Sequence, residues 1–299
     1  MEKITGLVIA AYTPMREDET INFDKIGELV EYAVNHRMAG LFVNGSTGEF
    51  ASLTLEERIR TADAYIAAAA GRIPIIVNVA STCRRDSLRL AERAAASGAD
   101  AICAMAPYYF PPSSPRALAD FISGIIPGCG GKPLFLYYAG NIAGGTISVY
   151  EFLRIMVEEQ PGFAGVKFTS DNLCEYRRCL ALSDRLQILY GRDEMLLGAL
   201  AMGAVAAIGT TFNYLPRVYH GIVDAFGRND FDEARRLTDI THRAVSVASH
   251  YGMPALKGFM KLAGIDVGPW RSPLDRFSVD AEKRFVAEVE AAGLREYLG

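Results

Sequence analysis

The stretch PIIVNVASTCRRDSLRLAERAAASGADAICAMAP, residues 74–107, places a strand, a helix and a second strand in succession. Its first and last segments are short apolar runs without alternating polar residues, as in strands that are covered on both faces. The amphipathic segment between them ends at Gly98, and glycine is favoured just beyond a helix C-terminus. The stretch therefore predicts one unit of a parallel sheet, in which a helix connects neighbouring strands.

The same unit recurs along the chain. Comparable apolar runs, each followed by a stretch of helical character, occupy residues 6–14, 40–46, 134–139, 163–169, 187–191 and 205–211. Eight such strand–helix units predict a (β/α)8 TIM barrel. The alternative is a doubly wound sheet, but the glycine-rich dinucleotide motif that would favour it does not follow the first strand.

The helix expected after the second strand has signals at both ends. Thr54 is followed three residues later by Glu57, which predicts a capping box at the N-terminus of this helix. Gly71 is the predicted C-cap.

More sequence follows the eighth strand than the last helix of a barrel needs. Residues 231–249 and 279–298 have helical periodicity. We therefore expect a barrel over residues 1–225 and a C-terminal helical extension over residues 226–299 that packs on the barrel.

The composition limits the class of protein. Half of the 299 residues are hydrophobic, the formal net charge is −4, and lysine and arginine are scattered rather than clustered. This pattern argues against nucleic acid as a partner and leaves small-molecule substrates open. The five cysteines form no CxxC motif and have irregular spacings, which favours reduced thiols and a cytoplasmic location.

Residues 195–215 carry no charge over a length that would span a membrane. They are rich in glycine, alanine and threonine, and we interpret them as a buried helix, a turn near Gly203 and a strand. The N-terminal segment predicts a first strand rather than a signal peptide, because its short apolar run is broken by Thr13 and Pro14. We expect no membrane partner.

The lysine in FAGVKFTSD, residues 163–171, is unusual for a buried strand, because an unpaired ammonium group is costly to bury. Active sites of such barrels lie at the C-terminal ends of the strands, where Lys167 is expected. Burial favours the neutral form of an amine, and a neutral amine can form a Schiff base with a ketone. The alternative is a structural lysine that is paired with a carboxylate.

Other strand ends carry groups that suit a keto acid. The motif GSTGE, residues 45–49, is either a turn whose backbone N–H groups bind a carboxylate, or an ordinary loop and helix cap. Tyr137 can transfer protons, whereas the aromatic residues 108–110 either assist or pack. Asp193 and Glu194 either bind sugar hydroxyls or begin the next helix.

The four histidines, residues 36, 220, 242 and 250, lie on predicted helices and lack the spacing of metal ligands. The sequence therefore predicts no metal site, and we expect chemistry without a cofactor.

Together the motifs GSTGE, PYY, a strand ending in YY and GVKFT resemble the pyruvate-dependent class I aldolase family, which contains dihydrodipicolinate synthase and N-acetylneuraminate lyase. The resemblance covers nearly the whole chain and implies a homotetramer of barrels with C-terminal helices. It implies that Lys167 forms the Schiff base with pyruvate and that Tyr137 carries the proton. It also implies that Ser46 and Thr47 bind the pyruvyl carboxylate.

In this family a tyrosine from a neighbouring subunit often assists, and Tyr109 is the best match, followed by Tyr108. Residues 189–215 are similar to the neuraminate lyase branch of the family. This similarity implies that the substrate tail is bound by Thr169, Gly191, Asp193, Glu194 and Thr210.

The loop after the fifth strand separates the branches. The synthase branch has an arginine there that binds the carboxylate of the aldehyde substrate, and this chain has Ile142 at the matching place. Gly140 stands where the family usually has a proline, and glycine leaves a turn less restricted than proline does.

The resemblance thus implies a carbon–carbon lyase that cleaves N-acetylneuraminate, or a close sugar acid, reversibly to pyruvate and an aldose. The alternatives are an aldolase for another 2-keto-3-deoxy sugar acid, or dihydrodipicolinate synthase acting on pyruvate and aspartate semialdehyde. In a different class, the barrel would be a non-catalytic sensor of a keto acid.

Overall fold

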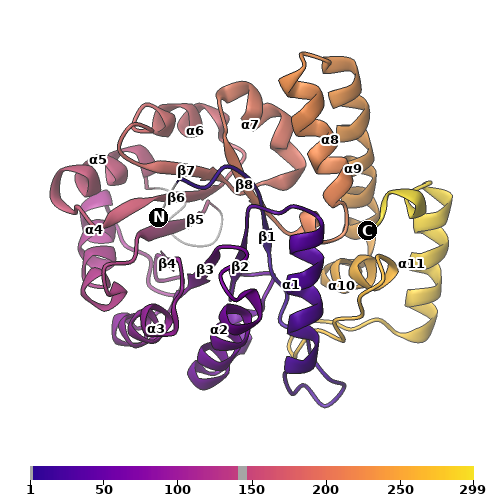
Figure 1. Cartoon of the computed structure of the whole chain (residues 1–299), viewed down its shortest axis with the longest axis horizontal. Helices are drawn as coiled ribbons and strands as arrows, with labels where there is room; N and C mark the ends of the chain where they lie inside the picture. Colours follow the sequence, from indigo (N-terminus) through magenta and orange to yellow (C-terminus); the bar gives the residue numbers. More distant parts are fainter. Residues whose placement is uncertain (1–2, 141–146) are drawn as a thin grey trace.

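Eight parallel strands close into a barrel in the computed structural model, which describes residues 3–140 and 147–299 (Figure 1). Each strand pairs with the next in sequence, and β1 pairs with β8 to complete the ring. The strands are β1 Gly6–Ala10, β2 Gly40–Val43, β3 Ile75–Asn78, β4 Ala101–Met105, β5 Leu134–Ala139, β6 Phe163–Thr169, β7 Gln187–Tyr190 and β8 Ala206–Gly209. The predicted (β/α)8 TIM barrel is confirmed.

A ring of helices surrounds the strands (Figure 1). Buried apolar side chains of these helices belong to one hydrophobic core with those of the strands. These helices are α1 Ile26–Asn35, α2 Leu55–Ala69, α3 Arg84–Ser97, α4 Pro115–Ser123, α5 Val149–Glu159, α6 Leu173–Leu180, α7 Leu196–Met202 and α8 Pro216–Gly227. Most apolar runs in the sequence extend beyond their strands, because the residues at the run ends turn into the connecting loops.

The capping box predicted for α2 is confirmed, whereas its predicted C-cap is wrong by one residue. The Thr54 hydroxyl accepts a hydrogen bond from the Glu57 N–H (3.2 Å), and the Glu57 carboxylate accepts one from the Thr54 N–H (2.9 Å). The C-cap is Ala70, in the left-handed region at φ 47°, and Gly71 follows it at φ 73°. The chain leaves the helix one residue before the glycine because alanine here adopts the conformation that glycine favours.

The segment 195–215 forms a helix and a strand as predicted. Its helix α7 ends at the C-cap Gly203, with φ 106°, and β8 follows. Within the described residues, every helix is too short or too polar to cross a bilayer.

Three further helices, α9 Phe231–Tyr251, α10 Met253–Leu262 and α11 Val279–Ala291, lie together on one side of the barrel near α8 and α1 (Figure 1). Helix α9 contacts α8, α10 and α11. Helix α8 runs across the boundary expected at residue 225, so the division into barrel and extension remains a prediction.

Strand β6 approaches β7 more closely than most side chains would permit. Gly165 has a φ of +151°, and a Cβ atom at this position would lie 1.9 Å from the carbonyl oxygen of Gln187. Because backbone atoms cannot move aside as a flexible side chain can, the pairing of these strands requires glycine at position 165.

We predict that Gly165→Ala lowers the free energy of unfolding by about 3 kcal/mol or more, since the new methyl group overlaps the β7 backbone. Denaturant unfolding followed by circular dichroism measures this loss. Gly27→Ala is the control, because a Cβ there meets no atom within 4 Å. It should change the unfolding free energy by no more than about 1 kcal/mol. Equal stability of the two variants would contradict the close approach of β6 and β7.

Candidate active site

Lys167 lies inside the barrel, with 5% of its surface exposed. Its Nζ atom lies 4.1 Å from the ring centroid of Phe42 on β2 and 4.0 Å from that of Tyr137 on β5. Among residues 3–140 and 147–299 it forms no ion pair with a carboxylate. The structural alternative, a lysine paired with an acid, therefore finds no support in the described part of the chain.

The strand register explains why Lys167 and Tyr137 meet. They are paired residues in neighbouring parallel strands, so their side chains leave the sheet on the same face. The Tyr137 hydroxyl in turn lies 3.2 Å from Oγ of Ser46, and either group can donate the hydrogen bond. An amine, a phenol and an alcohol thus form a continuous group.

The loop at residues 45–49 follows β2. The N–H groups of Gly48 and Glu49 donate to the carbonyls of Gly45 and Ser46, at 3.1 and 3.0 Å. The N–H groups of Ser46 and Thr47 meet no acceptor within the part of the chain that the structure describes. Such adjacent backbone donors form a site that suits an anion.

The alternative role of this loop, as a helix cap, does not apply to its hydroxyl residues. Helix α2 is capped by Thr54, and the intervening 3-10 helix Phe50–Ser52 has Glu49 at its N-cap position. The Thr47 hydroxyl instead lies 2.6 Å from the hydroxyl of Thr210, which follows β8. This contact brings the ends of β2 and β8 together.

Thr169 and Gly191 adjoin one another at the ends of β6 and β7. The Thr169 hydroxyl oxygen is buried and has no hydrogen-bond partner among the described residues. A Cβ atom at position 191 would lie 2.0 Å from this oxygen. Glycine is thus needed at 191 to leave room for the hydroxyl group.

Asp193 and Glu194 lie in the 3-10 helix Asp193–Met195, directly before α7. Asp193 Oδ2 accepts hydrogen bonds from the N–H and the hydroxyl of Thr211, at 2.6 and 2.5 Å. Burial raises the pKa of Asp193 and the Glu194 charge adds to this effect, while the hydrogen bonds from Thr211 oppose it. Glu194 Oε1 accepts a hydrogen bond from Nε of Arg192 (2.9 Å). The two acids therefore precede helix α7, and each also accepts hydrogen bonds from a neighbouring side chain. The sequence did not indicate these partners, Thr211 and Arg192.

The aromatic residues after β4 lie at the surface. Tyr109 is 76% exposed, Phe110 is also exposed, and their rings pack edge to face with centroids 4.8 Å apart. Tyr108 packs edge-on against Phe50, at 6.2 Å between centroids. Tyr109 is thus not a core packing residue and lies on the surface, whereas Lys167 is buried.

The loop after β5 contains Gly140 and Ile142. The Gly140 N–H donates to the carbonyl of Thr169 (3.0 Å), which joins the start of the loop to β6. Ile142 lies outside the described residues.

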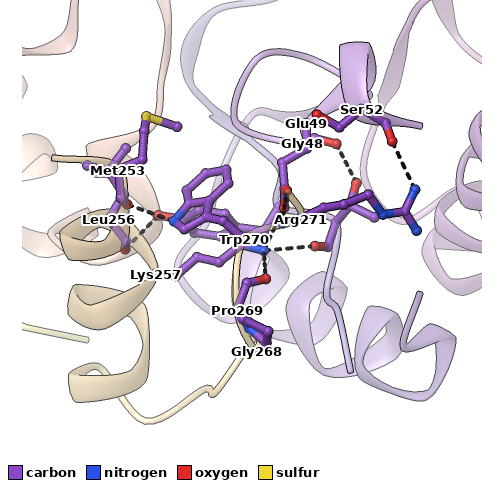
Figure 2. A network of polar contacts seen from close by, with 12 residues as sticks. Gly48, Glu49, Ser52, Met253, Leu256, Lys257, Gly268, Pro269, Trp270 and Arg271 are labelled. Carbon is purple, nitrogen blue, oxygen red and sulfur yellow. Dashed lines mark hydrogen bonds and ion pairs between the residues drawn. The ribbon is translucent and has the colours of Figure 1, made fainter. Parts of the chain in front are cut away.

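The C-terminal part of the chain contributes to the site, which the sequence did not indicate. The last residue of the GSTGE motif, Glu49, forms a buried ion pair with Lys257 of α10, with Nζ and Oε1 2.6 Å apart (Figure 2). Next to the loop lies an apolar cavity of about 290 Å³, whose lining includes Ser46, Phe50, Tyr108, Met253 and Leu274. No local pattern could reveal these contacts, because the partners are distant in sequence.

Within the described part of the chain, no three His, Cys, Asp or Glu side chains gather closely enough to hold a metal ion.

Comparison with known proteins places this geometry in a family. Residues 3–292 match the model of the dihydrodipicolinate synthetase family. The N-acetylneuraminate lyase of Gallus gallus is 35% identical, over 97% of this chain and 95% of that protein. The N-acetylneuraminate lyase of Pongo abelii is 34% identical, over 97% and 92%.

The solved structures agree with the sequence comparisons. The native structure of the N-acetylneuraminate lyase from Aliivibrio salmonicida superposes with a TM-score of 0.94, at 31% identity, and covers 98% of each chain. The resemblance drawn from the motifs at the strand ends is thereby confirmed. This chain belongs to the dihydrodipicolinate synthetase family.

Proposed function

We propose that this protein is a Schiff-base lyase that cleaves N-acetylneuraminate, or a close sugar acid, reversibly to pyruvate and an aldose. The observation that carries the proposal is the buried Lys167 amine beside the Tyr137 ring, with no carboxylate paired to it in the described residues. Relatives named N-acetylneuraminate lyase, more than 30% identical over nearly the whole chain, favour this substrate over the other acids of the family. A solved dihydrodipicolinate synthase that is 23% identical supports only the fold.

The reaction begins when Lys167 attacks the keto carbon of the open-chain acid. Addition forms the C–N bond, and loss of water from the carbinolamine gives the protonated imine. The faces of the Phe42 and Tyr137 rings, within about 4 Å of the amine, attract the cationic nitrogen of this intermediate. The substrate carboxylate binds the N–H groups and hydroxyls of Ser46 and Thr47.

Cleavage then requires removal of the proton from the C4 hydroxyl. Tyr137 takes this proton as its own phenolic proton passes toward the substrate carboxylate, beside the Ser46 hydroxyl 3.2 Å away. The C3–C4 bond breaks, its electrons enter the imine to form an enamine, and C4 leaves as the carbonyl of the aldose. Protonation of the enamine at C3 and hydrolysis of the imine release pyruvate and the free amine.

The remaining strand ends bind the hydroxylated tail of the substrate. Asp193 and Glu194 each use one carboxylate oxygen in the contacts described above, and the other oxygen accepts hydrogen bonds from sugar hydroxyls. The buried Thr169 hydroxyl supplies a further partner. Thr210 and Gly191 complete this part of the site.

We assign the exposed Tyr109 to the site of a neighbouring subunit, in a homotetramer. A tyrosine that is buried by a subunit contact would explain why so large an aromatic side chain lies on the surface of one chain. The five free thiols support a reducing, cytoplasmic location. The proposed chemistry uses the amine of the protein itself and no cofactor.

The substrate choice is tested by measuring kcat/KM for three substrates. These are neuraminate, 2-keto-3-deoxygluconate, and the pair of aspartate semialdehyde and pyruvate. We predict the highest kcat/KM for neuraminate, by about tenfold or more, because the acids and hydroxyls at β6 to β8 match a polyhydroxy tail. Efficient turnover of another acid without turnover of neuraminate would contradict this choice and retain the imine chemistry.

We predict that incubation with pyruvate and borohydride adds a reduced pyruvyl group to Lys167, as read by peptide mass spectrometry. Lys167→Met should abolish the adduct and lower kcat by about 10³-fold or more, since the nucleophile is lost. Lys261→Met, on the surface of α10, serves as the control and should keep both the adduct on Lys167 and the wild-type kcat. A wild-type protein without an adduct would instead be a keto-acid sensor.

Tyr137→Phe separates imine formation from bond cleavage. We predict that this variant still forms the borohydride-trapped adduct but has a kcat lowered by about 10²- to 10⁴-fold, because the proton carrier is missing. The control is Tyr138→Phe, which removes the neighbouring phenol and should leave kcat within about twofold. Normal turnover of Tyr137→Phe would exclude the phenol as the proton carrier.

A further inference from the structure

The side chain of Glu49, the last residue of the proposed carboxylate-binding loop, is held by the C-terminal part of the chain. Its side chain is 0% exposed, and its backbone lies in the left-handed region at φ 57°. One carboxylate oxygen lies 2.6 Å from Lys257 Nζ, and the other accepts a hydrogen bond from the Arg271 N–H (2.8 Å) (Figure 2). Because non-glycine residues seldom adopt this conformation, contacts from elsewhere must maintain it.

Lys257 is itself anchored on several sides. Its side chain is 4% exposed, and its amine donates to the carbonyls of Pro269 (2.7 Å) and Thr13 (3.4 Å) as well as to Glu49. The amine also lies 4.6 Å from the centroid of the Trp270 ring. Burial lowers the pKa of Lys257, and the Glu49 carboxylate opposes this effect. The three acceptors fix the direction in which the amine meets Glu49.

A second contact fixes the loop at Gly48. The Thr13 hydroxyl donates to the carbonyl of Gly48 (2.7 Å), while the Thr13 carbonyl accepts from Lys257. Gly48 and Glu49 therefore belong to one polar network with α10. Ser46 and Thr47, whose N–H groups have no acceptor in the described part of the chain, directly precede these two anchored residues.

The segment beyond the loop is held by the same part of the chain. The Arg271 guanidinium donates to the carbonyl of Ser52 (2.9 Å) and to both carboxylate oxygens of Glu57 (2.8 Å each). The fork geometry of arginine makes such paired bonds directional. Residues 257–271 thus hold the chain from the end of the loop into the first turn of α2.

From these contacts we infer that Glu49 and Lys257 are a positioning pair, through which α10 fixes the N–H and hydroxyl groups of Ser46 and Thr47 in the orientation that binds a keto-acid carboxylate. The inference rests on the proposed function of that loop. The pair acts through the loop backbone, and Lys167 performs the covalent chemistry.

Stability alone is a poor explanation for this pair. The cost of removing two charges from water offsets much of their attraction, so a buried ion pair is weak evidence for stabilisation. The pair instead fixes the orientation of the Glu49 carboxylate and of the loop that carries it, because each of its bonds has a defined donor and acceptor. Loss of the pair should therefore weaken carboxylate binding more than it changes the reaction of a bound substrate.

The test uses the full-length single variant Lys257→Met and the double variant Glu49→Gln/Lys257→Met. The double variant removes both charges of the pair and keeps an amide oxygen for the Arg271 N–H, so it should recover much of the unfolding free energy that the single variant loses. In both, we expect the pyruvate concentration for half-maximal borohydride-trapped adduct to rise by about tenfold to hundredfold. The adduct yield at saturating pyruvate and kcat should remain within about twofold, because Lys167 and Tyr137 are intact.

The matched control is Lys261→Met, which removes a lysine of the same helix whose partner Glu282 lies on α11, and it should behave as wild type. A double variant with wild-type stability and wild-type half-saturation by pyruvate would overturn the positioning role. If the single variant does not fold, the double variant decides the question. A wild-type protein that forms no adduct would refute the proposed function itself. This outcome differs from failure of the positioning role, in which wild type and double variant form the adduct equally well.

Discussion

The position of the Lys167 amine among aromatic rings is the constraint on which the remaining structure depends. A carboxylate partner would hold the amine in an ion pair, whereas the rings of Phe42 and Tyr137 enclose it without such a bond. The closed barrel provides this environment, because side chains from β2, β5 and β6 converge on one interior point. The other polar groups of the proposed site lie at the ends of the strands and in the loops that follow them.

The fold could be predicted almost completely from the sequence because each unit carries its own local signal. Apolar runs without alternation identified buried strands, and the pair Thr54 and Glu57 identified the start of α2. The error at Gly71 arose because residue preference alone does not tell which of two left-handed residues ends a helix. The contact of Glu49 with Lys257 was beyond such reasoning, because it joins residues 208 positions apart and has no periodic signature.

The proposed tail site illustrates the same limit at the level of side chains. Motif similarity predicted Asp193 and Glu194 as site residues, but only the structure reveals that Thr211 and Arg192 donate hydrogen bonds to them. These contacts fix the orientation of both acids in the free protein, and in the proposed tail site such preorganisation would lower the entropic cost of binding. A hydrogen bond of 2.9 Å between His242 Nε2 of α9 and the Glu194 carbonyl also holds the backbone at this end of β7.

The C-terminal helices thus contact the mouth of the barrel at two places, through Lys257 to Glu49 and through His242 to the Glu194 backbone. A nascent chain in which all eight strands have left the ribosome still lacks the residues that hold these loops. On this arrangement the loop at residues 45–49 gains its contacts with Lys257 and Arg271 only after synthesis has passed residue 271.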